Sequence, residues 1–498
     1  MTLVVSVLCL LVALAALPRQ LRVAQREHYL AGSVGWVQRI WLSRSRVSVA
    51  LLVLAVLLVV VGLVASRWWW LAAAVVAVAS PVGLPWRGRT SPLHWTARVR
   101  RLAGVTALLL LGAALLGVGV VGALLLPLFV DGALAVTGTL EARLSNRFLV
   151  QAKERIAKVR PTVVAITGSY GKTSTKNYLA HLLAGSRSVL ASPASFNNAM
   201  GLSRTVNDGL VPGTEVLVAE MGTYGPGEIA RLCEVFPPDV AVLTAIGEMH
   251  LQRMGTREGV LAAKAEITVG ARVVVVNTDD DLLQRLAGEC AGRGQQVLRC
   301  STVDAGADVA LVGGHLHVSG EDLGPVELPE TAVPGNAAVA LGAALALGED
   351  LRRLARRLRD LPTVAHRLEP VEQPGGSWIL DDTYNSNPAG AAMALRRAVQ
   401  LADRSGGRVH VVTPGMVELG DVQDIRNEEL AREIAGASVA TLVVVGRTNA
   451  GALVRGGSVG GTQVVQAADR AAAVALVGQR SAPGDVVLFE NDLPDHYP

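Results

Sequence analysis

Residues 165–176, A-I-T-G-S-Y-G-K-T-S-T-K, constrain the fold of this chain more than any other stretch. A β-branched run at 162–167 reads as a strand, and residues 173–183 read as a helix. Gly168 and Gly171 lie in the turn between these two elements. A turn of this kind points backbone amides and a helix N-terminus at a phosphate group. The stretch therefore predicts a nucleotide-binding loop inside an α/β domain.

The two residues after the second glycine strengthen this prediction. Lys172 supplies a positive charge for phosphates, and Thr173 supplies a hydroxyl for Mg²⁺. The spacing G-x-x-G-K-T is two residues shorter than the usual G-x4-G-K-[ST]. The setting between a strand and a helix favours a functional loop over a chance turn rich in Gly and Lys.

The N-terminal part of the chain has a different character. Four apolar runs occur, at about 3–17, 47–66, 68–86 and 102–130. The second run has 20 residues without a charge, enough to cross ~30 Å of hydrocarbon. Seven of the eight Trp precede residue 102, as expected of a segment anchored at a bilayer interface. We therefore predict a multi-pass protein of the cytoplasmic membrane with three or four transmembrane helices and with its catalytic domains facing the cytoplasm.

The charge distribution supports the same interpretation. Twelve Arg, no Lys and one acid, Glu27, precede residue 102, so this part carries +11 and the remainder carries −7. The pI near 9.0 is therefore no evidence for binding of nucleic acid. Arg-rich loops at 18–46 and 87–101 should both face the cytoplasm. Four full spans would then place the region after residue 130 outside, so the number of spans stays open.

From about residue 150 onward, short β-branched runs alternate with Ala- and Leu-rich helical stretches. Strands are predicted at 162–167, 215–220, 239–245, 272–277, 377–381, 408–413, 441–446 and 485–489. Strand–helix alternation predicts parallel sheets covered on both faces. We divide the chain into a membrane region (1–130), a connecting helix (131–160), a P-loop-type central domain (161–365) and a C-terminal Rossmann-like α/β domain (366–498). The four Cys show no metal-ligand spacing and predict neither a zinc site nor a disulfide framework.

Three further residues follow predicted strands or lie on a predicted helix. Glu220 ends the run 215–220, His250 follows the run 239–245, and Lys264 lies in V-L-A-A-K-A-E-I. Ligands of open α/β sheets gather at the carboxyl ends of the strands. Taken singly, Glu220 would more often be a structural cap or a surface group, His250 a structural histidine and Lys264 a solvated lysine.

The order of motifs changes this interpretation. The stretches T-G-S-Y-G-K-T-S-T, S-F-N-N-A-M-G, A-E-M-G, H-L, A-A-K-A-E-I, D-D-T-Y-N-S-N-P and V-E-L-G resemble the Mur ligases over about residues 160–480. The resemblance implies an ATP-dependent amide ligase of cell-wall (peptidoglycan) biosynthesis. Such an enzyme activates a carboxylate as an acyl phosphate and joins it to an amino acid or dipeptide, as D-alanyl-D-alanine-adding members do.

The resemblance also implies roles for individual residues. Catalytic roles fall to Lys172, His250 and Lys264. ATP contacts fall to Gly168, Gly171, Lys172, Thr173, Ser174, Asn336, Arg367 and Asp382. Ligands for Mg²⁺, two ions by the resemblance, fall to Thr173, Glu220, His250 and a carbamylated Lys264. Substrate contacts fall to Asn197, Asn198, Asn385 and Glu418.

Several positions depart from the family pattern. Ser195, Gly335, His366 and Asn427 stand where the family has Asn, His, Gly and His. The membrane region replaces the UDP-sugar-binding domain, and F-E-N-D-L-P-D-H-Y-P replaces a basic K-G-S-type segment. We therefore expect an acceptor that is lipid-linked or polymeric and is met at the membrane.

Three other functions compete with this one. A membrane-anchored poly-γ-glutamate-type synthetase would keep the same chemistry. A P-loop ATPase driving transport lacks support, since no Walker-B run is evident and few ionisable residues lie in the apolar runs. A catalytically inactive scaffold would not be expected to retain Lys172, Glu220, His250 and Lys264 together.

Overall fold

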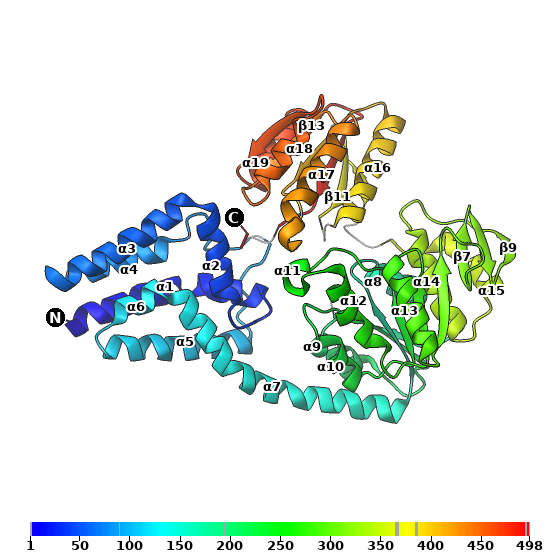
Figure 1. Ribbon diagram of the computed structural model, residues 1–498, viewed down its shortest axis with the longest axis horizontal. Coiled ribbons are helices and arrows are strands. Elements are labelled where there is room, and N and C mark those ends of the chain that lie inside the picture. Colours follow the sequence, from blue (N-terminus) through cyan, green and yellow to red (C-terminus); the bar gives the residue numbers. More distant parts are fainter. Residues whose placement is uncertain are drawn as a thin grey trace. The chain divides into compact units, whose positions relative to one another are not determined.

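The computed structural model describes residues 2–88, 90–193, 196–363, 368–383, 387–493 and 496–497. The chain forms two compact units, and each is described by itself. The first unit contains residues 1–144 together with 446–450 and 492–498, and the second contains 145–445 and 451–491. Figure 1 colours the chain from blue at the N-terminus to red at the C-terminus.

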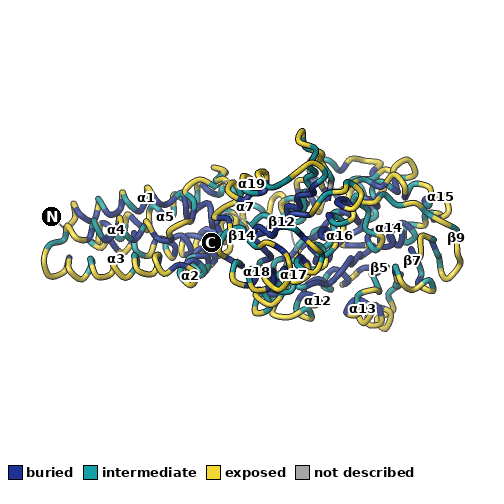
Figure 2. Tube along the Cα trace, turned by 90° about the horizontal axis from the view of Figure 1, so that it is seen from above, coloured by how far each residue is buried: buried dark blue, intermediate teal, exposed yellow. Residues whose placement is uncertain are grey.

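The first unit is helical. Its helices are α1 (Thr2–Arg26), α2 (Ser33–Arg44), α3 (Arg46–Val64), α4 (Trp68–Ala79), α5 (Ala97–Leu115), α6 (Gly119–Leu124) and the beginning of α7 (Leu126–Val159). In the described part of the chain, two helices are long and apolar enough to cross a membrane, α1 and α3. The predicted run 68–86 yields only the 12-residue α4, and the run 102–130 is divided among α5, α6 and α7. Many apolar residues of α3 are exposed, and Figure 2 colours much of this helix as exposed.

A carboxylate fixes the start of α2 in this unit. The Asp131 side chain accepts hydrogen bonds from the backbone amides of Gly32, Val34 and Gly35 at 3.0, 3.1 and 2.8 Å. These amides belong to the first turn, where a helix lacks internal partners and favours negative charge.

The C-terminal segment is also held in this unit, because the Trp41 indole nitrogen donates to the His496 carbonyl at 2.8 Å.

The central domain of the second unit is built on a nine-stranded sheet with the order β2-β3-β1-β4-β5-β6-β7-β8-β9. Its strands are β1 (Thr162–Thr167), β2 (Val189–Ala191), β3 (Val216–Glu220), β4 (Val240–Leu243), β5 (Val273–Asn277), β6 (Gln296–Ser301), β7 (Val309–Val312), β8 (His315–Val318) and β9 (Glu321–Pro325). Pairing is parallel from β2 to β7, and β8 and β9 extend the sheet by antiparallel pairing.

Helices cover both faces of the central sheet. They are α8 (Lys172–Leu183), α9 (Ala199–Gly209), α10 (Glu228–Val235), α11 (Leu251–Met254), α12 (Arg257–Ala265), α13 (Asp281–Gly292), α14 (Pro334–Ala346) and α15 (Leu351–Ala355). Alternation along β1 sends Val164 and Ile166 into one apolar core and Val163 and Ala165 into another. Both faces of β1 are therefore buried, as parallel strands require.

The C-terminal domain contains a six-stranded sheet with the order β10-β11-β15-β12-β13-β14. Its strands are β10 (Glu369–Glu372), β11 (Trp378–Asp382), β12 (Val409–Thr413), β13 (Thr441–Val445), β14 (Gln463–Ala467) and β15 (Val486–Glu490). Its helices are α16 (Pro388–Ser405), α17 (Gln423–Gly436), α18 (Ala450–Gly457) and α19 (Arg470–Gly478). All strands but the antiparallel β10 pair in parallel. The predicted α/β class with two parallel-sheet domains is thus confirmed.

A buried carboxylate pins the beginning of β15 to the beginning of β12. The Asp485 carboxylate accepts from the backbone amides of Arg408 and Ala482 and lies 3.1 Å from His410 Nε2. Although burial by itself would raise the pKa of Asp485, these hydrogen bonds lower it to about 2. The ionised carboxylate therefore stabilises the folded domain above about pH 4, and this contribution is lost as the pH falls through about 2.

We expect the Asp485→Asn variant to be less stable at pH 7 by about 2 kcal/mol, because one pKa unit corresponds to about 1.4 kcal/mol. The difference from the wild type should shrink as the pH falls from about 4 to about 2. Urea unfolding at several pH values measures it, with the exposed Asp421→Asn as the control. A difference independent of pH would contradict this account.

Candidate active site

The loop that joins β1 to α8 has the backbone shape of a phosphate cradle. Gly168 has φ 153°, and a Cβ atom there would lie 2.0 Å from Thr244 Oγ1. The Lys172 ammonium folds over the loop and donates to the carbonyls of Gly168 at 2.7 Å and Ser169 at 3.2 Å. The cationic group is thus held at the N-terminus of α8, where an anion is favoured.

Asn336 lies against this loop from a different helix. It occupies the first turn of α14 and is 8% exposed. Gly171 has φ +83°, and a Cβ atom on it would lie 2.3 Å from Asn336 Oδ1. Two residues 165 positions apart, both predicted to contact ATP, are therefore brought together.

We expect the Gly171→Ala variant to weaken ATP binding by about 1–3 kcal/mol, because the added methyl group displaces the Asn336 amide and reshapes the loop. Gly185→Ala is a matched control, since Gly185 has φ +89° and its added Cβ would meet nothing within 4 Å. Titration of each variant with ATP measures the affinity. Equal losses in both variants would mean that backbone strain alone is responsible.

Glu220 ends β3 as predicted and is 3% exposed. Thr173 Oγ1 donates to its two carboxylate oxygens at 3.0 and 3.2 Å, and Asn197 Nδ2 lies 3.4 Å from Oε1. Oxygen ligands next to each other around an octahedral Mg²⁺ are ~3 Å apart when each is ~2.1 Å from the ion. The hydroxyl and carboxylate oxygens therefore suit Mg²⁺ in both chemistry and separation.

The sequence reasoning missed Lys176. This residue is 1% exposed, and its Nζ lies 3.0 Å from Glu220 Oε2. Its place four residues after Lys172 puts both lysines on the same side of α8. The spacing in K-T-S-T-K could have indicated this second lysine.

Lys264 lies on α12 and is 1% exposed. Burial, and then the positive charge of Lys172, lower the pKa of Lys264 well below its usual value. A lysine in such a place is a neutral amine far more readily than a solvated one. Among the described residues, no three His, Cys, Asp or Glu side chains gather as a metal site, so a bound Mg²⁺ would depend on other oxygen donors.

His250 precedes α11 with a left-handed backbone, φ 63°. Its Nδ1 lies 2.6 Å from the carboxylate of Glu418, and the Tyr224 ring meets the imidazole edge-on with centroids 5.2 Å apart. Glu418, which we predicted to contact substrate, is thus placed against a predicted metal ligand.

The remaining predicted residues fall into three groups. Asn198 caps α9 by accepting from Gly201 N at 3.0 Å, and Ser174 is buried in α8. Asp382 ends β11, at the carboxyl edge of the C-terminal sheet. Arg367 and Asn385, and the departures Ser195 and His366, lie outside the described residues.

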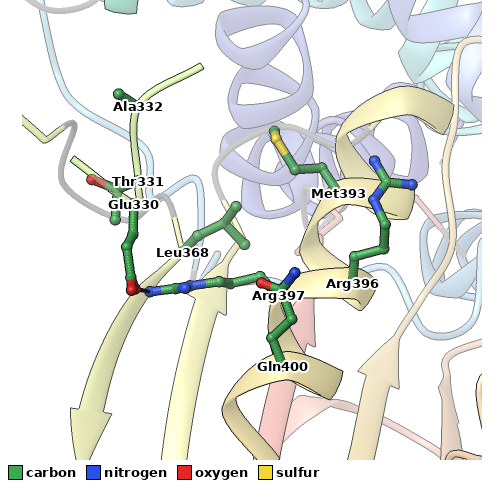
Figure 3. Close-up of a pocket in the computed structure, with 8 residues that line it drawn as sticks. All are labelled: Glu330, Thr331, Ala332, Leu368, Met393, Arg396, Arg397 and Gln400. Atoms are coloured by element: carbon green, nitrogen blue, oxygen red, sulfur yellow. Dashed lines mark hydrogen bonds and ion pairs between the residues drawn. The ribbon is translucent and has the colours of Figure 1, made fainter. Parts of the chain in front are cut away.

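A pocket of about 140 Å³ lies between the segment before α14 and the helix α16 (Figure 3). Arg397 reaches across it to the Glu330 carboxylate, and Arg404 contacts the same carboxylate at 3.1 Å. Leu368 and Met393 form its apolar wall. Glu330 thus joins the central domain to α16 by two ion pairs.

Comparisons with known proteins agree with this architecture. The Mur ligase middle domain family matches residues 166–331, and the Mur ligase glutamate ligase domain family matches residues 366–490. UDP-N-acetylmuramoyl-tripeptide–D-alanyl-D-alanine ligase of Mycobacterium tuberculosis is 31% identical over 373 residues, which cover 66% of this chain and 70% of the relative.

Solved structures give the same result. MurF from Acinetobacter baumannii is similar with a TM-score of 0.59 and 26% identity, covering 69% of this chain and 77% of that one. MurF ligase from Thermotoga maritima, solved in complex with ADP, is similar with a TM-score of 0.58 and 28% identity, covering 70% of this chain and 80% of that one.

The predicted localisation as a multi-pass membrane protein is wrong. Both family matches begin after residue 165, and the relatives are named as ligases of a UDP-linked peptide. The described chain has only two helices that pass the length and hydropathy criteria, and apolar core helices and N-terminal signal sequences pass the same criteria. Run length and Arg-rich flanks do not distinguish a membrane span from a packed helix, and α1 packs part of its apolar surface inside the helical unit.

Proposed function

This chain belongs to the Mur ligase family, and we propose that the residues around its phosphate-binding loop carry out the ligation. It is an ATP-dependent peptide ligase that uses Mg²⁺ and resembles the D-alanyl-D-alanine-adding ligases. The observation that carries the proposal is the convergence of Lys172, Thr173, Glu220 and Asn336 on one loop.

The chemistry divides into two bond changes. A substrate carboxylate attacks the γ-phosphorus of ATP, which gives an acyl phosphate and ADP. An amine then attacks the acyl carbon, phosphate leaves, and the amine loses a proton. Phosphoryl transfer depends mainly on positioning and charge neutralisation.

The residues of this chain suit those two demands. We assign Lys172 to the transferred phosphoryl group, the glycine loop to the other phosphates, and Asn336 to the nucleoside side of ATP. Thr173, Glu220 and His250 would hold Mg²⁺, which supplies further charge neutralisation. Contacts between the two α/β domains would keep water from the acyl phosphate. Arg367, Asp382 and Asn385 are assigned to closure over ATP and substrate, and Asn197 and Asn198 to the acceptor side.

We further propose that Lys264 is carbamylated. Its Nζ lone pair would attack CO₂, form an N–C bond and release one proton, which turns an amine into a carboxylate-like group. The conversion is favoured beside Lys172 because it replaces a neutral amine by a negatively charged carbamate, which pairs with the positive charge of Lys172.

For substrates, we propose a muramoyl peptide as the carboxylate and a D-alanyl-D-alanine-type dipeptide as the amine. This rests on the names and identities of the relatives. The lipid-linked or polymeric acceptor suggested by the sequence has no support from these relatives. We also propose that the domains of the chain meet near residues 130, 160 and 365.

Phosphate release by the full chain with ATP and Mg²⁺ tests the function. The panel pairs UDP-muramoyl tripeptide with D-alanyl-D-alanine, polyglutamate with glutamate, and a lipid-linked muropeptide with D-alanyl-D-alanine. Release that requires the first pair supports the proposal. Release with ATP alone, unaffected by any amine, would refute ligation.

A further inference from the structure

Two loops of the second unit meet at the edge of the candidate site. One is the segment before and within α11, residues 247–252, and the other is the segment 416–426. The His250 imidazole and the Glu418 carboxylate lie 2.6 Å apart, and Gln252 N donates to the Glu418 carbonyl at 3.2 Å. Arg426 makes a two-pronged ion pair with Glu248 at 2.6 and 2.7 Å. The central and C-terminal domains are therefore joined by backbone, hydrogen-bond and charge contacts at one place.

The backbone at this meeting point is unusual. His250 has φ 63° and Glu418 has φ 66°, so two non-glycine residues with left-handed backbones contact each other through their side chains. Such conformations are costly and persist only where the surrounding structure imposes them. They concentrate at functional sites more than at ordinary loop contacts.

Neighbouring residues hold both side chains in place. The buried Asn427 pins the segment of Glu418, because its amide accepts from Met416 N at 2.8 Å and donates to Met416 O at 2.9 Å. On the other side, the Tyr224 ring packs edge-on against the imidazole. The imidazole is thus fixed by an aromatic ring of its own domain and by a carboxylate of the other.

We propose that Glu418 is a positioning residue for His250. Docking of the C-terminal domain then orients the imidazole for its proposed role as a ligand of Mg²⁺. An ionised carboxylate only accepts hydrogen bonds, so Nδ1 carries the proton and Nε2 presents its lone pair. A histidine that ligates a metal commonly donates its other ring N–H to a carboxylate in this way. Before docking, Glu418 is absent, so the Tyr224 ring still contacts the imidazole but the Glu418 carboxylate does not select its tautomer. This inference rests on the role proposed for His250.

The coupling has a chemical advantage. An acyl phosphate formed while the two domains were apart would be open to hydrolysis. A site whose imidazole is completed only by docking restricts phosphoryl transfer to the docked state. Arg426 and Glu248 hold the domains together, whereas Glu418 alone reaches the imidazole among these contacts.

The test compares Glu418→Ala and Glu418→Gln in the full chain. We expect Glu418→Ala to lower kcat about 10- to 100-fold, the usual effect of losing such a partner. KM for ATP should change less than about threefold, because the phosphate contacts are assigned to the loop between β1 and α8 and not to Glu418. Glu418→Gln should retain most of the activity, because its amide oxygen still accepts from Nδ1. The exposed Asp424→Ala is the control on the same segment.

A second readout does not depend on turnover. Mn²⁺ binding in the presence of ADP, followed by electron paramagnetic resonance, should weaken about tenfold in Glu418→Ala and stay unchanged in Glu418→Gln and Asp424→Ala. Equal losses in the Ala and Gln variants, or no loss in either, would overturn the inference.

The His250→Ala variant distinguishes failure of the role proposed for His250 from failure of the positioning role proposed for Glu418. If His250→Ala leaves both turnover and Mn²⁺ affinity intact, the role proposed for His250 fails and the positioning role fails with it. If His250→Ala impairs both while Glu418→Ala impairs neither, only the positioning inference fails.

Discussion

Replacing Lys172 by methionine is expected to lower kcat for ligation about 1,000-fold, the upper range for removing one preorganised donor from a site of developing charge. The Lys172 ammonium already lies over the loop, 2.7 Å from the Gly168 carbonyl. When ATP binds, the ammonium would release that carbonyl and contact the charged phosphate oxygens instead. The attraction between the ammonium and these oxygens strengthens as charge shifts during phosphoryl transfer. Methionine keeps the length and most of the bulk but loses the charge.

The separation of kcat from binding makes this prediction specific. ADP lacks the transferred phosphoryl group, so its affinity should fall only about tenfold, by loss of one charged contact. Rapid-quench measurement of ATP cleavage in a single turnover gives the first quantity, and calorimetric titration with ADP gives the second. Lys153→Met, a change at an exposed lysine of α7, is the matched control. A Lys172→Met variant that cleaves ATP at the wild-type rate would remove the loop from the mechanism.

The central part of the fold could be predicted because its signals are local. All eight predicted strands are present, since β-branched runs bounded by Gly, Pro or Asp read the same in isolation and in the sheet. The strands that were missed include the three-residue β2 and the hairpin of β8 and β9, and also the six-residue β6. They depend on pairing with a neighbour rather than on their own pattern, which the sequence does not display.

The site shows the same division. The spacing of Gly168, Gly171 and Lys172 is enough to predict the loop from the sequence. The contact between His250 and Glu418 could not be predicted in this way, because it joins positions 168 residues apart. Left-handed backbones at non-glycine residues are also invisible in a sequence. The N-terminal error has a comparable origin, because apolar helices that pack against each other and apolar helices that span a bilayer share one composition.

Replacing Lys264 by alanine is expected to lower the rate of ligation about 100-fold or more. The variant loses a buried group that interacts electrostatically with Lys172 of the phosphate-binding loop. If the working form is a carbamate, the alanine variant leaves a space that a small carboxylate can enter. Formate or acetate should then restore part of the activity in a saturable manner. Phosphate release measured against increasing formate gives the result, with equal ionic strength maintained by chloride.

The source of the negative charge can be tested on the unaltered chain. Activity in buffer stripped of CO₂ should fall and return when bicarbonate is added, and ¹³C-labelled CO₂ should give a carbamate signal that is absent in Lys264→Ala. Lys153→Ala, at an exposed position, should respond to neither treatment. Full activity of Lys264→Ala without added carboxylate would exclude both the carbamate and a catalytic lysine. Loss of activity without rescue or carbamate signal would mean that the working form of Lys264 is the unmodified side chain, and the pairing of opposite charges beside Lys172 would then be wrong.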